Sequence, residues 1–198
     1  VEAATAAADT RAMNGSYLTH QFLIAMPTMG DPNFDHTVTY ICEHNDDGAL
    51  GIVINRPLTL RLGGLFEQLS VEDADPDSAD DPVMAGGPVG LERGFVLHTH
   101  TDPWDSTLAI DDQISITTSR DILEAMARGN GPAQTLVALG YAGWGAGQLE
   151  QEMQQNAWLS GPADQAILFD LPADQRWEAA ARLLGVDVNL LSSDTGHA

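Results

Sequence analysis

The stretch GALGIVINRP, residues 48–57, decides the fold of this chain. A turn glycine starts it, a short apolar run fills it, and a polar residue, a cation and a proline end it. Such a run is typical of a buried strand, and sheets often carry ligand sites where their strands end. The stretch therefore predicts a core strand that presents two hydrogen-bonding side chains, Asn55 and Arg56, at its end.

The residues before this stretch predict its partner strand. Within residues 36–44, Val38, Tyr40 and Cys42 share one face of an alternating pattern. The turn at residues 45–48 ends in Asp-Gly, which tolerates the positive φ of a hairpin. We therefore expect residues 36–44 and 49–55 to pair antiparallel.

Apolar periodicity and turn residues mark the other elements. Strands outnumber helices and come in neighbouring hairpins, which predicts an α+β fold with a mixed sheet in one domain. The expected strands are 22–26, 83–89, 94–98, 108–110, 114–116, 135–139 and 166–169, the expected helices are 60–69, 119–128, 148–159 and 172–185, and exposed or glycine-rich loops are expected at 72–82 and 140–147.

The ends of the chain are expected to lie outside the folded domain. Residues 1–15 are rich in alanine and lack the basic start and apolar core of a signal peptide, so we expect a disordered leader. The domain is expected over residues 16–190, with a frayed tail at 191–198. The single cysteine and the absence of an apolar stretch long enough to span a membrane predict a cytosolic protein.

The charge of the chain restricts its partners. Acidic residues outnumber basic ones by 29 to 8, which gives a formal net charge of −21. All the basic residues are arginine, so a Schiff-base lysine or a P-loop lysine is excluded. Phosphate binding depends on clusters of cations, so the charge opposes direct binding of nucleic acid or anionic lipid. The same composition would suit a proteome that lives in high salt, and both explanations stay open.

A glycine-rich segment, residues 140–147, precedes the expected helix 148–159. Free amides at a helix N-terminus favour an anion, but Gln148 stands where a dinucleotide fingerprint has its third glycine. Glu150 and Glu152 also place negative charge in the first turns. We therefore expect a tight turn in which Trp144 covers the core.

Two patterns of potential metal ligands are incomplete. The acidic run from Asp73 opens like a calcium loop, but Ser78 and Met84 stand where that loop needs glycine and glutamate. His98 and His100 share a face of an expected strand, and no third ligand is evident. We predict neither a metal site nor a cofactor.

Cys42 and His44 are the candidates for covalent chemistry. Two residues apart on a strand, they would share a face with Cβ atoms roughly 7 Å apart, since each residue advances about 3.3 Å. A thiolate–imidazole pair would make Cys42 nucleophilic. The alternative is that Cys42 is a small core residue among apolar neighbours.

Asn55 and Arg56 also have two interpretations. An amide and a guanidinium side by side could clamp a carboxylate or phosphate. Alternatively, Arg56 pairs with one of the many acids of the chain and Asn55 closes the turn. The Ser119-Arg120-Asp121 segment is more typical of a helix cap than of a catalytic triad.

Together these segments resemble the YqgE/AlgH family of small bacterial proteins over roughly residues 18–186. The resemblance implies a cytosolic protein with a single α+β domain built on a mixed, largely antiparallel, partly barrel-like sheet with flanking helices. It implies no agreed catalytic residues, and some members carry the label of transcription regulators linked to alginate production. The matching stretches are residues 22–27, 48–57, 86–89, 94–98, 117–121, 140–150 and 156–158.

We therefore expect a non-enzymatic protein that binds a small molecule or a protein partner and has an indirect regulatory role. One alternative is a hydrolase or acyl-transfer enzyme that uses Cys42 with His44. A second is a regulator that binds DNA directly, which the charge disfavours. The expected ligand-binding surface gathers Asn55, Arg56, Gly86, Gly87, Arg120, Trp144 and Gln148.

Overall fold

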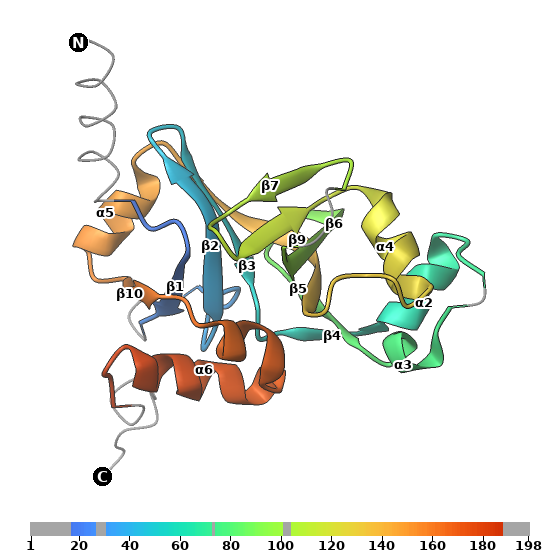
Figure 1. Ribbon diagram of the computed structural model, residues 1–198. Helices are drawn as coiled ribbons and strands as arrows, with labels where there is room; N and C mark the ends of the chain where they lie inside the picture. The colour runs from blue at the N-terminus through green and yellow to red at the C-terminus, as the bar shows by residue number, and fades with distance from the viewer. Residues whose placement is uncertain (1–16, 27–30, 73, 101–103, 188–198) are drawn as a thin grey trace.

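The computed structural model of the chain describes residues 17–26, 31–72, 74–100 and 104–187. Within these residues ten strands form one curled sheet in the order β10-β1-β2-β3-β9-β6-β8-β7, and β5 joins β4 to β9 (Figure 1). The strand pairs are antiparallel except for β5 and β9. This arrangement confirms the expected α+β class and the mixed, largely antiparallel, partly barrel-like sheet. The strands are β1 (Gln21–Ala25), β2 (Val38–Asn45), β3 (Gly48–Val53), β4 (Pro57–Arg61), β5 (Pro82–Ala85), β6 (Val89–Thr99), β7 (Thr107–Ala109), β8 (Ile114–Thr117), β9 (Thr135–Gly145) and β10 (Trp158–Pro162).

The helices lie on two sides of the sheet. α5 and α6 flank the half that contains β1, β2 and β10, whereas α2, α3 and α4 lie at the opposite end of the molecule (Figure 1). No helix among the described residues is long and apolar enough to cross a bilayer. The bounds are α2 (Leu62–Gln68), α3 (Pro76–Ala79), α4 (Arg120–Ala127), α5 (Gln148–Gln154), the π-helix η3 (Ala166–Asp170) and α6 (Ala173–Leu183).

Strand β9 joins the two halves of the sheet. Its first half pairs with β5 and β6, and its second half pairs with β3 through Ala142 to Gly145. The segment expected to be a glycine-rich loop, residues 140–147, is therefore mostly strand, and only its end turns into α5. The prediction of a loop there was wrong because β3 supplies the backbone partners that a glycine-rich strand needs, and those partners lie far away in the sequence.

Gly86 and Gly87 form a backbone crossing at the junction of the two halves. The amide of Val53 donates to the carbonyl of Gly86, and the amide of Gly86 donates to the carbonyl of Leu139. Gly87 has φ +155°, and a Cβ atom there would lie 2.1 Å from the carbonyl carbon of Tyr141. These two glycines are therefore required for the close approach of three strands.

Three groups of buried apolar side chains pack these layers together. The first fills the inside of the curled sheet against η3 and α6, the second lies under α2 and α4, and the third lies beside α5. Representative members are Phe22, Tyr40, Ile52 and Leu168 in the first, Leu62, Phe66, Ile122 and Val137 in the second, and Leu23, Ile41, Leu149 and Trp158 in the third.

The structure corrects several of the expected elements. Residues 166–169 are helical rather than a strand, because Asp164 accepts a hydrogen bond from the amide of Ile167 and its carbonyl accepts one from the amide of Leu168. The expected helix 148–159 ends at Gln154, and β10 follows it. The acidic loop 72–82 contains the short helix α3. The expected leader at 1–15 and tail at 191–198 lie outside the described residues, as does Asp73.

Candidate functional site

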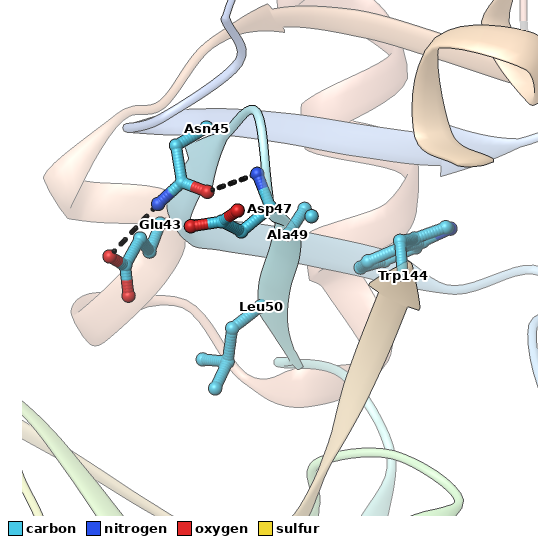
Figure 2. A pocket seen from close by; sticks show the side chains of 7 residues that line it. Glu43, Asn45, Asp47, Ala49, Leu50 and Trp144 are labelled. Atoms are coloured by element: carbon cyan, nitrogen blue, oxygen red, sulfur yellow. Dashed lines mark hydrogen bonds between the residues drawn. The ribbon is translucent and has the colours of Figure 1, made fainter. Parts of the chain in front are cut away.

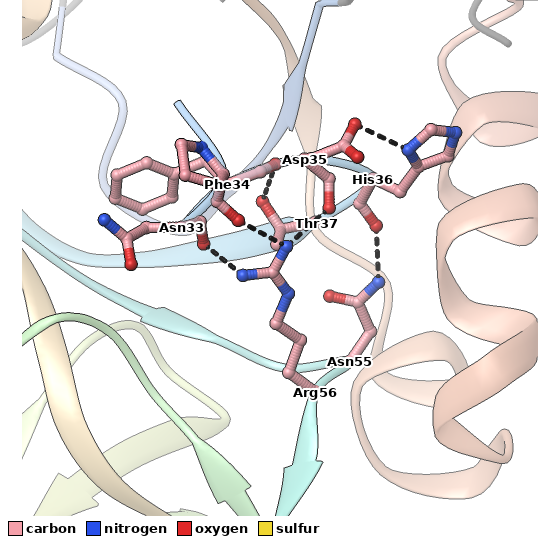
Figure 3. A network of polar contacts seen from close by, with 8 residues as sticks. Asn33, Phe34, Asp35, His36, Thr37, Asn55 and Arg56 are labelled. Carbon is pink, nitrogen blue, oxygen red and sulfur yellow. Dashed lines mark hydrogen bonds and ion pairs between the residues drawn. The ribbon is translucent and has the colours of Figure 1, made fainter. Parts of the chain in front are cut away.

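Arg56 binds the backbone of a neighbouring turn. Its Nη1 atom donates to the carbonyl of Asn33 at 2.6 Å, and its Nη2 atom donates to the carbonyls of Pro32 at 3.0 Å and Asp35 at 2.7 Å (Figure 3). These are charge-assisted hydrogen bonds to carbonyl oxygens. None of these contacts is the ion pair with an acidic residue that the second interpretation predicted. The guanidinium instead holds residues 32–35 against the end of β3 by hydrogen bonds to their carbonyls.

Asn55 binds the same turn from its other end. Its side-chain oxygen accepts from the amide of Val38 at 2.9 Å, and its side-chain nitrogen donates to the carbonyl of His36 at 2.8 Å (Figure 3). Both hydrogen-bonding ends of the amide are therefore used by the backbone. Asn55 and Arg56 together organise the connection into β2.

Trp144 and Gln148 lie at the other end of β3, near α5. The indole nitrogens of Trp144 and Trp158 both donate to Oε2 of Glu152, at 2.7 Å and 2.9 Å. Gln148 accepts a hydrogen bond from the amide of Gly145 at 2.9 Å. Trp144 is 7% exposed, so it covers the core as expected from the sequence.

A shallow hollow lies beside Trp144 and the β2–β3 hairpin. Figure 2 shows Glu43, Asn45 and Asp47 on the hairpin, with Trp144 on the adjacent strand. The amide of Asp47 and the side chain of Glu43 are both bonded to Asn45. The hollow has a volume of about 340 Å³, and its charged lining residues are acidic.

Cys42 and His44 do not share a face. Ile41 pairs with Gly51 and Glu43 pairs with Leu50, which leaves Cys42 as the extra residue of a β-bulge. Cys42 consequently packs inside the first apolar group, and its burial raises the pKa of the thiol far above its ordinary value. The predicted shared face was wrong because a bulge reverses the alternation of side chains beyond it.

His44 is engaged elsewhere. Its Nδ1 atom accepts from the amide of Leu18 at 2.9 Å, which places the ring proton on Nε2, and that atom lies 2.7 Å from Glu150 of α5. The His44 side chain is 1% exposed. Neither the base nor the nucleophile of the enzyme alternative is therefore available in the expected pair.

His98 and His100 also bind separate partners. Nδ1 of His98 lies 2.9 Å from the carbonyl of Thr99, so Nε2 is the acceptor for the hydroxyl of Thr117 at 2.7 Å. Burial lowers the pKa of His98, which keeps its ring neutral. His100 lies 2.8 Å from Ser115. In the described part of the chain no group of three or more His, Cys, Asp or Glu residues could hold a metal ion.

A mainly apolar pocket lies between α2, α4 and the sheet. We call it the α2–α4 pocket; its volume is about 180 Å³. Arg120, one of the expected ligand residues, lines it together with Thr117, Thr118 and Ser119, and Glu92 lines it as well. Its apolar lining residues are Leu65, Leu69, Phe95, Val96, Leu123, Val137 and Leu139, and Gly94 also lines it.

Arg120 connects the two helices at the edge of this pocket. Its Nε atom lies 2.9 Å from Glu124, and its Nη2 atom donates to the carbonyl of Leu69 at the end of α2. Arg120 also lines an adjoining open hollow of about 420 Å³ together with Arg128, Glu72 and Glu124. In the described structure, Arg128 forms no ion pair. The α2–α4 pocket thus combines a mainly apolar lining with hydroxyl groups, the guanidinium of Arg120 and the carboxylate of Glu92.

The seven expected ligand residues do not converge on one site. Asn55 and Arg56 bind a turn, Gly86 and Gly87 form the strand crossing, Trp144 and Gln148 lie near α5, and Arg120 alone lines the α2–α4 pocket. The lining leucines were missed because their spacing indicates only a helix face that packs on the core. Whether a cavity remains beneath such a helix face depends on the elements that pack against it, and no pattern in the sequence indicates this.

The chain is therefore a small α+β protein with a curled, mixed sheet and helices at both ends of the molecule. A family model described as AlgH-like matches residues 22–189, so the chain is a member of the AlgH-like family and the resemblance is confirmed. UPF0301 proteins of Thioalkalivibrio sulfidiphilus and Nitrosococcus oceani are 60% and 56% identical; each alignment covers 92% of this chain and 98% or 97% of the relative.

One solved structure supports the same assignment, and a second has the same fold. The solution structure of the AlgH protein from Pseudomonas aeruginosa has a TM-score of 0.77 and 51% identity, and the match covers 93% of this chain and 97% of that one. The protein DIP2367 from Corynebacterium diphtheriae has a TM-score of 0.65 at 19% identity, with coverage of 84% and 86%, and shares the fold.

Proposed function

We propose that this protein is a cytosolic, non-enzymatic module that binds a small molecule in the α2–α4 pocket. The ligand has an apolar body and a head group that accepts hydrogen bonds, such as a carboxylate. The observation that carries the proposal is the lining of this pocket, in which leucine, valine and phenylalanine residues surround a few polar groups around Arg120. This combination is typical of small-molecule sites.

The size of the pocket limits the ligand. Drug-sized ligands occupy cavities of roughly 300–1,000 Å³, and the α2–α4 pocket has about 180 Å³. A short aliphatic chain fits this space better than a nucleotide or a polycyclic molecule. The apolar floor supplies most of the binding free energy, because burial of apolar surface contributes about 25 cal/mol per Å².

The polar edge of the pocket selects the head group. Arg120 uses Nε and Nη2 for Glu124 and Leu69, which leaves its Nη1 atom without a partner in the described structure. A guanidinium nitrogen only donates, so it favours an acceptor over a second cation. Glu92 also lines the pocket, so the preference applies to the Arg120 end, where we propose that a carboxylate head group accepts a hydrogen bond from Nη1.

The regulatory role is proposed to be indirect. A net charge of −21 repels the phosphate backbone, so any effect on transcription would pass through a ligand or a protein partner. A gel-shift assay at about 50 mM salt, where phosphate contacts are strong, should show no retardation of DNA. Retardation there would favour the regulator that binds DNA directly.

Calorimetric titration with hexanoate and hexylamine tests the proposed function. These probes share an apolar chain and differ in the head group, and we expect saturable heat from hexanoate only. Leu123→Trp fills the pocket and should abolish that heat, whereas Leu183→Trp, on the exposed face of α6, should leave it unchanged. Equal binding of both probes, or binding that survives in folded Leu123→Trp, would contradict the proposal.

A further inference from the structure

Arg176 is a buried cation that forms no ion pair with any carboxylate of the described residues. It lies on α6 and is 6% exposed. Its Nη1 atom donates to the carbonyl of Ile54, and its Nε atom donates to the carbonyl of Leu171 at 3.1 Å. Among the described residues its Nη2 atom has no hydrogen-bond partner. Burial of a charge that is only partly compensated lowers the stability of the folded protein, which suggests that Arg176 has a further binding partner.

The guanidinium keeps its charge at neutral pH. Burial lowers the pKa of Arg176 to about 10, which is still well above the pH of a cytosol. The neutral carbonyl oxygens of Ile54 and Leu171 solvate the cation but do not neutralise it. A full positive charge therefore persists beneath α6 in a protein that is otherwise strongly acidic.

Arg176 lines a cavity that also contains two carboxylates. The cavity has a volume of about 240 Å³ and lies between α6, η3 and the first residues of β5 and β9. Asp81 and Asp170 line it as well, and Asp170 accepts a hydrogen bond from Gln134 at 2.8 Å. No ion pair joins Arg176 to either aspartate in the described structure.

This charge arrangement restricts the ligand. A simple anion would pair with Arg176 but would meet Asp81 and Asp170 in the same cavity. A simple cation would pair with the aspartates and leave Arg176 uncompensated. A molecule with both charges satisfies all three side chains, and its two charges must lie a few bonds apart to fit a cavity of about 240 Å³.

We propose that the Arg176 cavity binds a small zwitterion of the amino-acid class. Its carboxylate accepts hydrogen bonds from the guanidinium of Arg176, and its ammonium group donates to Asp81 and Asp170. Met84, Phe169 and the aliphatic parts of the lining contact the short carbon chain between them. This cavity is distinct from the α2–α4 pocket, with which it shares the lining residue Val137, and neither proposal depends on the other.

Titration of the full chain with three matched probes tests this proposal. β-Alanine carries both charges, propionate carries only the carboxylate, and ethylamine carries only the ammonium group. The signal of the Arg176 Nε–Hε group in ¹H–¹⁵N spectra reports binding directly. We expect saturable shifts with β-alanine at millimolar concentrations and affinities for propionate and ethylamine that are weaker by about tenfold or more, the effect of losing one charged hydrogen bond.

Substitutions separate binding from folding. Arg176→Met should abolish β-alanine binding, and Arg182→Met, on the exposed face of the same helix, should preserve it. Because Arg176→Met could fail to fold, the Asp81→Asn, Asp170→Asn double variant provides a second test. It should bind β-alanine about tenfold or more weakly and propionate more tightly than the native chain does.

Three results would overturn the zwitterion site. They are the absence of saturable shifts with any probe, equal affinity of the native chain for propionate and β-alanine, and unchanged probe preference in the double variant. The hexanoate titration reports on another cavity, so failure of this proposal is distinguishable from failure of the proposed function.

Discussion

At the scale of single residues, the sequence indicated that Arg56 is important but did not determine which groups it binds. The abrupt change from an apolar run to Asn55 and Arg56 indicates that these side chains have specific partners. Those partners are backbone carbonyls and an amide in residues 32–38. Almost any residue type can supply a backbone carbonyl or amide, so no sequence pattern could have predicted these partners.

Replacement of Arg56 by alanine should destabilise the protein. Three hydrogen bonds from a charged donor disappear, so we expect the free energy of unfolding to fall by about 2 kcal/mol or more. Urea denaturation followed by circular dichroism measures this change. Arg61→Ala is the control, because in the described structure the Arg61 guanidinium forms a single hydrogen bond of 3.4 Å, and the substitution should change stability by no more than about 0.5 kcal/mol. Equal effects of the two substitutions would contradict the assigned role of Arg56.

Cys42 should be unreactive in the folded protein. Burial raises its pKa, so iodoacetamide at neutral pH should label it only after unfolding. The unfolded thiol ionises above roughly pH 8.5, whereas the native thiol stays protonated. The contribution of the Cys42 thiol to the free energy of unfolding is therefore fully present below that pH. Above it, this contribution falls by about 1.4 kcal/mol per pH unit. Cys42→Ala should lack this extra slope, and rapid labelling of the native chain would restore the cysteine-enzyme alternative.

At the scale of secondary structure, local patterns predicted the hairpins better than the long strands. The β2–β3 and β7–β8 hairpins were predicted because each has turn residues between two apolar runs. The second half of β9 was not predicted, since its glycine-rich sequence has low strand propensity and is held by pairing with β3. The π-helix η3 was assigned to a strand because a short apolar run has no helical period to detect.

The crossing of strands at Gly86 and Gly87 can be tested by adding one methyl group. Gly87→Ala places a Cβ atom against the backbone of Tyr141, and overpacking together with backbone strain should lower the unfolding free energy by about 3 kcal/mol or more. Gly147→Ala is the matched control, because Gly147 also has positive φ, at +73°, but has no atom within 4 Å of the added carbon. It should cost only about 1–2 kcal/mol. Thermal denaturation of both variants decides the point, and similar costs would argue against a steric crossing.

At the scale of the whole molecule, the fold was predicted from several motifs taken together and not from any single motif. Segments scattered over the chain resemble one family, and the curled sheet brings them into contact. The pairing of Thr117 with His98, for example, joins two of those segments across β6 and β8. The pocket beside them could not be predicted, because cavities arise from packing between distant elements.

The charge of the whole molecule predicts its response to salt. At a net charge of −21 the folded state is opposed by self-repulsion, which salt screens over about 10 Å at 0.1 M and about 3 Å at 1 M. We therefore expect the melting temperature to rise between these concentrations of sodium chloride, and equally with choline chloride. A melting temperature that is constant or falls with both salts would show that the acidic surface does not limit stability.

The most direct test of the central claim is a map of ligand contacts on the native chain. Hexanoate added to ¹⁵N-labelled protein should shift the amide signals of the residues around the α2–α4 pocket, namely the end of α2, the middle of β6 and the start of α4, with one saturating curve. Shifts centred instead on the β2–β3 hairpin, or shifts that grow linearly without saturation, would contradict the account.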